Sequence, residues 1–264
     1  MLYPKKRLGQ NFLRDKNILR RIVCAAGIDK DDTVLEIGAG EGGLTELLLE
    51  AAGRVVCLDV DRQAVALLAK RFCLRANIDI RRCDFLRYDL GELGSCEKKI
   101  KVVGNIPFYI TSSIIERIIA WRDKISLAVI TVQKEVAQRV VARPPSSAYG
   151  RLSCLAQYYA RPSVLFGIKG GSFWPRPKVD AAVLRLELVP CPGYPACDEG
   201  LLFEIIRAGF GQRRKRLANA LCAIASRKAV VEALQGLGLS ANARIGELGL
   251  NELTTICSRI SLAR

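Results

Sequence analysis

Runs of β-branched and aliphatic residues alternate with helical patterns of apolar positions over the first 190 residues of the chain. We predict strands at residues 33–37, 55–59, 78–82, 100–103 and 127–132. Between or after these strands, apolar residues at helical spacing predict helices at residues 44–52, 63–72, 112–121 and 134–141. Two later β-rich runs predict strands that close one edge of the sheet, at residues 163–168 and 181–188. Such alternation is typical of βαβ units, so the predicted fold class is α/β with a largely parallel sheet.

The pattern changes at residues 190–195, which read Pro-Cys-Pro-Gly-Tyr-Pro. Three prolines and a glycine cannot continue a strand or a helix. Beyond this segment the periodicity is helical only, and we predict helices at residues 199–210, 216–225, 229–237 and 251–258. We therefore expect a domain boundary near residue 190, with an α/β domain over residues 1–190 and a small all-helical domain over residues 191–264.

The excess of positive charge in the chain indicates which class of binding partner to expect. Lys and Arg number 41 against 26 Asp and Glu, a net charge of +15. Such an excess attracts polyanions, so nucleic acid is the expected partner and an anionic membrane surface the weaker alternative. Two basic clusters are candidates for phosphate contact, namely Lys5, Lys6, Arg7 and Arg14 near the N-terminus and Arg213, Arg214, Lys215 and Arg216 in the helical part. Each cluster can instead be a solvated surface, and part of the second can be structural.

The absence of histidine and the spacing of the cysteines exclude several kinds of chemistry. It has no histidine, and its ten cysteines form no C-x-x-C pair, so we expect no metal site and no imidazole base. Scattered thiols suit a reducing cytoplasm better than a disulfide framework. Apolar runs are too short to span a bilayer, and none follows the first basic residues as a secretory signal would require. We expect a cytoplasmic protein, monomeric because no oligomerisation stripe is evident.

A glycine-rich loop follows the first predicted strand and reads Gly-Ala-Gly-Glu-Gly-Gly over residues 38–43. Gly38 and Gly40 would allow a sharp turn and a close approach of the backbone to a ligand. Asp59 ends the next strand, about twenty residues further on, where a carboxylate can bind ribose hydroxyls. These features predict a nucleoside site, and the alternative is a tight turn without a ligand.

The acidic residues around this loop favour one nucleoside over another. Glu36 and Glu41 flank the glycines and would disfavour a dinucleotide's pyrophosphate, whereas they suit a sulfonium that carries an ammonium group. Asp84 follows the third strand, where it can accept a hydrogen bond from an adenine amino group, with Phe85 packed near the ring. We therefore favour S-adenosylmethionine as the cofactor, with an NAD-dependent dehydrogenase as the alternative.

The fourth strand leads into Asn105, Ile106, Pro107 and Phe108, at the sheet edge where ligands bind. An adenine amino nitrogen is a poor nucleophile because its lone pair is delocalised into the ring. The Asn105 side-chain oxygen and the Ile106 carbonyl would accept its two N–H groups, Pro107 would stiffen the turn, and Phe108 would stack on a base extruded from its helix. Most of the rate would come from alignment, without a strong base. The alternative is a proline-containing turn with a core phenylalanine.

Residues 36–45 and 105–108 resemble the ribosomal RNA adenine N6,N6-dimethyltransferases. Further segments that look like blocks of this family lie at residues 8–13, 149–153, 173–180 and 210–217. The resemblance implies a Rossmann-like class I S-adenosylmethionine-dependent methyltransferase sheet with a small helical domain that docks on ribosomal RNA. The cofactor residues that it implies are Asn11, Leu13, Gly38, Asp59, Asp84 and Asn105. Those that it implies at the target adenine are Asn105, Phe108 and Phe173.

The block at residues 210–217 is similar to the branch that dimethylates two adjacent adenines near the 3′ end of small-subunit ribosomal RNA. The resemblance implies action on the assembling 30S subunit and a role in its biogenesis. Two alternatives remain, a large-subunit methyltransferase of the macrolide-resistance type and an assembly factor whose binding matters more than its chemistry. The chain departs from the family's common residues at Asp59, Phe108, Trp174 and Arg176.

Overall fold

The computed structural model describes residues 2–93 and 98–262, and these form two compact units. The first unit runs to residue 137 and resumes over residues 159–190, and the second combines residues 138–158 with the chain from residue 191 onward. The division after residue 190 lies at the expected boundary, but residues 138–158 were expected in the α/β domain. They join the second unit because Tyr158 stacks on Tyr194 at 5.7 Å and meets Phe203 edge-on at 5.6 Å.

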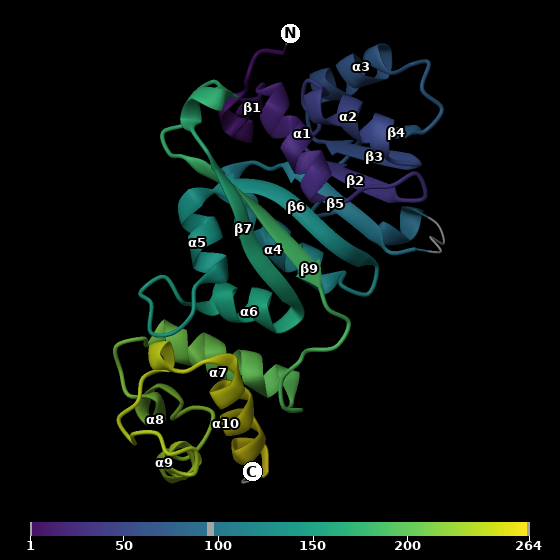
Figure 1. The fold of residues 1–264 in the computed structure, drawn as a ribbon. Coiled ribbons are helices and arrows are strands. Elements are labelled where there is room, and N and C mark those ends of the chain that lie inside the picture. Colours follow the sequence, from purple (N-terminus) through teal and green to yellow (C-terminus); the bar gives the residue numbers. More distant parts are fainter. Residues whose placement is uncertain (1, 94–97, 263–264) are drawn as a thin grey trace. The chain divides into compact units, whose positions relative to one another are not determined.

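The first unit is built on a seven-stranded sheet with the order β4-β3-β2-β5-β6-β9-β7 (Figure 1). The strands from β4 to β6 in this order are parallel to one another, whereas β9 runs antiparallel to both β6 and β7. The strands are β2 (Thr33–Ile37), β3 (Arg54–Asp59), β4 (Ile78–Arg82), β5 (Ile100–Asn105), β6 (Ile125–Gln133), β7 (Ala160–Ile168) and β9 (Ala181–Leu188). All seven predicted strands and the α/β fold class are thereby confirmed.

Where the chain crosses from one parallel strand to the next it forms α2 (Gly43–Ala51), α3 (Arg62–Arg71) and α4 (Thr111–Ala120), and α1 (Lys16–Ala25) precedes β2 (Figure 1). After β6 the chain forms α5 (Lys134–Val141) and α6 (Arg151–Tyr159). The core between sheet and helices includes Val34, Val55, Leu48 and Leu68, all fully buried. The central strands are continuously apolar because both of their faces are covered. Helices α1 and α6 were not predicted from the sequence pattern.

A second, two-stranded sheet ties the N-terminal segment to the chain after β7. Strand β1 (Phe12–Leu13) pairs antiparallel with β8 (Phe173–Trp174). The Phe12 ring stacks on Trp174 with centroids 6.4 Å apart, and the Arg14 guanidinium lies 4.3 Å from the Trp174 ring centroid. Strands of two residues carry no periodicity, so this pairing could not be predicted from the sequence.

The second unit is helical, with α7 (Glu199–Gly211), α8 (Leu217–Ala220), α9 (Arg227–Gln235) and α10 (Leu250–Leu262) beside α6. The predicted helix over residues 216–225 is wrong in its extent, because it ends at Ala220. The chain then continues in turns, with the Ile224 amide bonded to the Leu221 carbonyl at 2.8 Å. Single 3-10 turns complete the fold at η1 (Lys6–Leu8), η2 (Leu90–Leu93), η3 (Phe108–Ile110), η4 (Gly170–Ser172) and η5 (Ile245–Glu247).

Gly104 allows β5 to lie against β2 immediately before the candidate site. A Cβ at this position would lie 2.6 Å from the Ile37 carbonyl oxygen and 3.1 Å from the Ile37 Cβ, and the strand backbone cannot move aside. We expect Gly104→Ala to lower the free energy of unfolding by about 1–3 kcal/mol, measured by urea denaturation. Gly171→Ala is the control, because its Cβ would meet nothing within 4 Å. Equal destabilisation of both variants would contradict this explanation of Gly104.

Candidate active site

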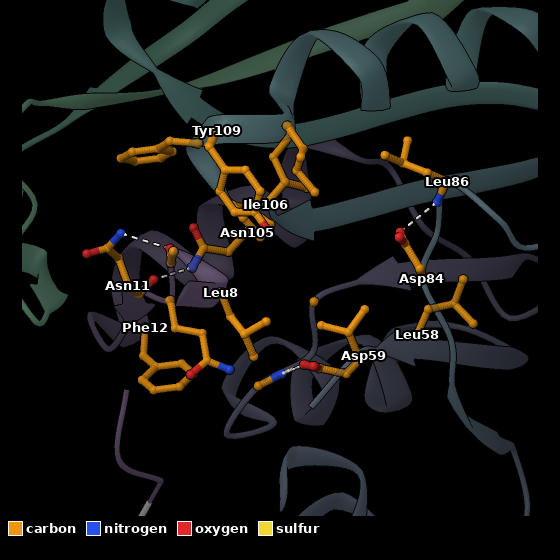
Figure 2. A pocket seen from close by; sticks show the side chains of 18 of the residues that line it. Leu8, Asn11, Phe12, Leu58, Asp59, Asp84, Leu86, Asn105, Ile106 and Tyr109 are labelled. Carbon is orange, nitrogen blue, oxygen red and sulfur yellow. Dashed lines mark hydrogen bonds between the residues drawn. The ribbon is translucent and has the colours of Figure 1, made fainter. Parts of the chain in front are cut away.

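A cavity of about 260 Å³ opens at the carboxyl ends of β2, β3 and β5 in the first unit (Figure 2). Its walls come from the N-terminal segment around Asn11 and from the loops that follow these strands and β4. This edge is where open α/β sheets bind their ligands. The residues expected there from the sequence and found in the lining are Asn11, Gly38, Gly40, Asp59, Asp84, Asn105, Ile106, Pro107 and Phe108.

The loop after β2 forms the floor of the cavity with backbone that only glycine adopts easily. Gly38 and Gly40 have φ angles of 71° and 53°. The Gly38 amide donates to the Leu58 carbonyl at 2.8 Å, and a Cβ on Gly40 would lie 3.0 Å from the Phe12 ring. Positive φ and close packing together explain why both positions are glycine. At Gly38 a ligand can therefore approach the main chain, whereas the space beside Gly40 is taken by the Phe12 ring.

Asp59, at the end of β3, is held by two backbone amides. Its Oδ2 accepts from the Gly40 amide at 2.9 Å and its Oδ1 from the Asp61 amide at 2.8 Å. Burial raises the pKa of Asp59, and these two amides oppose the rise. Each oxygen keeps a second lone pair, so the fixed carboxylate can still accept hydrogen bonds from a diol in the cavity.

Asp84 lies across the cavity from the N-terminal segment, after β4 (Figure 2). Its Oδ1 accepts from the Leu86 amide at 3.0 Å, while its Oδ2 has no hydrogen-bond partner among the described residues. The expectation that Phe85 lies near a ligand ring is not met. Phe85 is 3% exposed and packs edge-on against Trp121 at 5.5 Å, and Leu86 lines the cavity in its place.

The side-chain amide of Asn105 is oriented by the N-terminal segment. Its Nδ2 donates to the Asn11 carbonyl oxygen at 2.7 Å, and the Asn11 side chain in turn donates to the Gly9 carbonyl at 3.1 Å (Figure 2). This bond distinguishes the two ends of the Asn105 amide and leaves Oδ1 as an acceptor. Ile106 follows in the same turn and also lines the cavity, so the Asn105 Oδ1 and the Ile106 carbonyl oxygen are the candidates for the acceptor pair expected from the sequence.

The aromatic wall differs from the expected one. Phe108 lines the cavity, but Phe173 does not, since it is 5% exposed and packs edge-on against Phe108 with centroids 6.5 Å apart. Phe173 therefore lies behind the wall, because its pairing in β8 directs it into the core. Tyr109 lines the cavity and is 66% exposed, and it was not predicted from the sequence. The signal was available, since two aromatic residues follow Pro107 directly.

A second cavity of about 420 Å³ shares Phe12, Gly38, Gly40 and Asn105 with the first. Leu13 lines this second cavity and not the first one. Glu41 also lines it, but its charge is matched by Arg14 at 3.1 Å, and it accepts from the Leu2 amide at 3.1 Å. Glu41 therefore holds the N-terminal segment in place through Arg14 and Leu2. Because its charge is paired with that of Arg14, it adds little negative charge to the first cavity.

Glu36 lies beside the glycine loop and forms no ion pair with any cation among the described residues. It is 1% exposed, and its Oε2 accepts from the Thr45 hydroxyl at 2.7 Å and the Cys57 thiol at 3.2 Å. Desolvation raises the pKa of Glu36 to about 7, against the hydrogen bond from Thr45, which lowers it. At neutral pH this carboxyl is therefore divided between its neutral and charged forms.

The N-terminal basic cluster has two kinds of member. Lys5 is paired with the buried Asp61 at 2.6 Å, and Gln10 donates to the same carboxylate at 3.1 Å. Lys5 thus fastens the N-terminal segment to the sheet edge and is not available for phosphate contact. Lys6 and Arg7 are exposed.

The second basic cluster divides in the same way. The Arg213 guanidinium donates to the carbonyl oxygens of Ser146, Ser147 and Tyr149 at 2.8, 2.9 and 2.6 Å. It therefore stabilises the turn before α6 within the second unit, which is a structural role. The exposed cations in this cluster are Arg214, Lys215 and Arg216.

Two expected absences concern membranes and metals. None of the helices within residues 2–93 and 98–262 is long and apolar enough to cross a bilayer. In the same ranges, no three cysteine, aspartate or glutamate side chains gather as a metal site would require.

The raised pKa of Glu36 predicts a dependence of stability on pH. Because its pKa in the folded chain is about 7 against 4.5 ordinarily, the folded chain keeps a proton that the unfolded chain releases. The free energy of unfolding should therefore fall as pH rises between these values. Glu36→Gln removes this dependence, so its stability relative to wild type should rise between pH 5 and pH 8 by on the order of 3 kcal/mol, measured by denaturant unfolding.

The control for this measurement is Glu232→Gln in α9, where the side chain is 61% exposed. Its stability relative to wild type should change little over the same interval. A Glu36→Gln variant with the same relative stability at both pH values would show that the wild-type carboxyl carries no burial penalty.

Comparison with known sequences identifies a family whose members resemble this chain over nearly its full length. The sequence model described as ribosomal RNA adenine dimethylase matches residues 1–261. Ribosomal RNA small subunit methyltransferase A of Moorella thermoacetica is 40% identical, covering 97% of this chain and 92% of that protein. The protein of the same name from Pelotomaculum thermopropionicum is 39% identical, covering 96% of this chain and 90% of its own length.

Solved structures agree with the fold. A dimethyladenosine transferase from Plasmodium falciparum matches with a TM-score of 0.78 and 25% identity, covering 93% of this chain and 95% of its own. The 23S rRNA methyltransferase ErmE matches with a TM-score of 0.77 and 25% identity, covering 95% of this chain and all of its own. The sheet is thus that of a class I methyltransferase, and the chain belongs to the ribosomal RNA adenine dimethylase family.

Proposed function

We propose that this protein transfers methyl groups from S-adenosylmethionine to the N6 atoms of two adjacent adenines in the 3′-terminal hairpin of small-subunit ribosomal RNA. One observation carries the proposal. The Asn105 amide is held by the Asn11 carbonyl so that its oxygen remains an acceptor, in a cavity that also holds Asp59 and Asp84. The relatives at 39–40% identity are named for the small subunit, which favours that substrate over the large one.

The cavity residues fit the methyl donor. Asp59, fixed by two amides, would accept from the ribose hydroxyls, and the unpartnered Oδ2 of Asp84 would accept from the adenine amino group. The backbone at Gly38, which carries no side chain, would let the rest of the nucleoside come close to the main chain. Bound S-adenosylmethionine supplies an electrophilic methyl group, so the protein has to hold it and aim the acceptor.

The acceptor base would be held by the turn after β5. Asn105 Oδ1 and the Ile106 carbonyl would accept the two N–H groups of the adenine amino nitrogen, which favours a lone pair directed out of the ring plane. Phe108 would stack on the extruded base, and its own ring is supported from behind by Phe173. A nitrogen that has gained a methyl group is acidic and loses its proton to water, so no histidine is needed.

The exposed cations would hold the RNA backbone. Lys6 and Arg7 serve the first unit, and Arg214, Lys215 and Arg216 serve the second. Contacts of this kind release counterions and weaken steeply with salt, and they read no sequence. We expect the protein to act as a cytoplasmic monomer on the assembling 30S subunit.

The test of the function uses ribosomal subunits from a strain that lacks these methyl groups. Purified protein and labelled donor should place two methyl groups on each of two adjacent adenines in 30S subunits and none in 50S subunits, as mapped by mass spectrometry. Asn105→Ala should lower single-turnover methyl transfer at saturating donor at least about a hundredfold. It also removes the bond to Asn11, so donor affinity should fall as well, but by a smaller factor. Loss of the acceptor amide acts on alignment more than on donor binding.

Asn219→Ala, an exposed asparagine of the second unit, is the matched control and should transfer methyl groups like wild type. Label in 50S subunits would favour the large-subunit reaction. Turnover close to wild type in Asn105→Ala would refute the acceptor pair. Rescue of subunit maturation by an inactive variant would indicate an assembly factor, and calorimetric binding of NAD without binding of the donor would indicate a dehydrogenase.

Charge reversal tests whether the exposed cations of the second basic cluster contact RNA phosphates. Arg214→Glu with Lys215→Glu should weaken RNA binding at physiological salt and reduce the slope of log affinity against log salt by roughly one for each phosphate that is no longer neutralised. Arg227→Glu with Lys228→Glu changes the charge by the same amount on the exposed start of α9 and serves as the control. Equal weakening in the two double variants would mean that only net charge matters.

A further inference from the structure

Tyr109 is a large exposed side chain that the proposed reaction leaves without a role. It lies in η3, directly after Phe108 and four residues after Asn105, and it lines the same cavity. Its exposed fraction is 66%, whereas Phe108 is partly buried against Phe173. Two consecutive aromatic side chains thus line the cavity, and Tyr109 is the more exposed of the two (Figure 2).

The Tyr109 ring is held in place by the N-terminal segment. Gly9 has a φ angle of 60°, and a Cβ at this position would lie 2.9 Å from Tyr109 Cδ1 and 3.0 Å from Cε1. The ring therefore rests directly on the Gly9 backbone. Because this contact restricts the side chain while most of its surface stays exposed, the ring is already ordered for a flat partner.

The segment that contacts this ring also carries positive charge. Gly9 follows the 3-10 turn η1 directly, and Lys6 and Arg7 in that turn are exposed. Lys5 is excluded from this group by its pairing with Asp61. Exposed aromatic rings together with exposed cations are the means by which proteins bind single-stranded nucleic acid, the ring under a base and the cations at the phosphates.

We propose that Tyr109 stacks on the base next to the target adenine while Phe108 stacks on the target itself. The inference rests on the proposed function, since it requires an RNA substrate with the target base extruded. Tyr109 is then a positioning residue, because it holds the neighbouring nucleotide and touches no reacting atom. Stacking tolerates any base, so the ring would set the register of the strand and not its sequence.

The test uses a short hairpin RNA with 2-aminopurine, a fluorescent adenine analogue, in place of the base next to the target. Stacking on the ring should quench this probe in complexes of wild type, Tyr109→Phe and Tyr109→Trp. The complex of Tyr109→Leu should stay bright, and its KM for RNA should rise about tenfold, since base stacking on an aromatic ring has a substantial effect on affinity. Donor affinity and kcat at saturating RNA should stay close to wild type.

Tyr3→Leu is the matched control, because Tyr3 is 83% exposed and lies outside the cavity lining. It should quench and bind like wild type. Equal quenching and equal KM in Tyr109→Leu would overturn the proposal. A loss of donor affinity in Tyr109→Leu would also overturn it, by assigning the ring to the N-terminal wall. The fluorescence measurement needs binding alone, so wild type that quenches the probe without methylating RNA would contradict the proposed function while still showing that Tyr109 stacks on an RNA base.

Discussion

The hydrogen bond from the Asn105 side chain to the Asn11 carbonyl joins the two walls of the site. One wall is the turn after β5, which carries Asn105 and Ile106, and the other is the N-terminal segment around Asn11. The same bond fixes which end of the Asn105 amide stays free to accept a hydrogen bond. The positions of the two walls are therefore coupled through one contact, and the hydrogen bonds from Lys5 and Gln10 to Asp61 hold the N-terminal wall further.

Much of the fold could be predicted because its strands are buried on both faces. In strand β6, for example, seven of nine residues are buried, and the uninterrupted apolar run over residues 127–130 has few alternatives inside a protein. Helix α1 was missed because only Leu19 and Ile22 are buried along its ten residues. In the second unit the predicted helix at residues 216–225 was too long. Apolar residues continue at helical spacing after Leu217, although the helix gives way to a series of turns.

The candidate site divides along the same lines. Gly38, Asp59, Asp84 and Asn105 could be placed from the sequence because parallel strands deliver their carboxyl ends to one edge. The positions of Phe85, Phe173, Lys5 and Arg213 could not, since each depends on a partner far away along the chain. Local pattern identifies the loop on which a side chain lies, whereas tertiary packing decides the direction in which it points.

The pairing of β1 with β8 has a consequence for the order in which the molecule matures. Residues 12 and 13 leave the translating ribosome about 160 positions before their partners at 173 and 174. The parallel strands up to β6 can form from chain made earlier, but the pairing of β1 with β8 cannot. Newly made protein should therefore acquire the parallel part of its sheet before the N-terminal wall of the cavity is fixed.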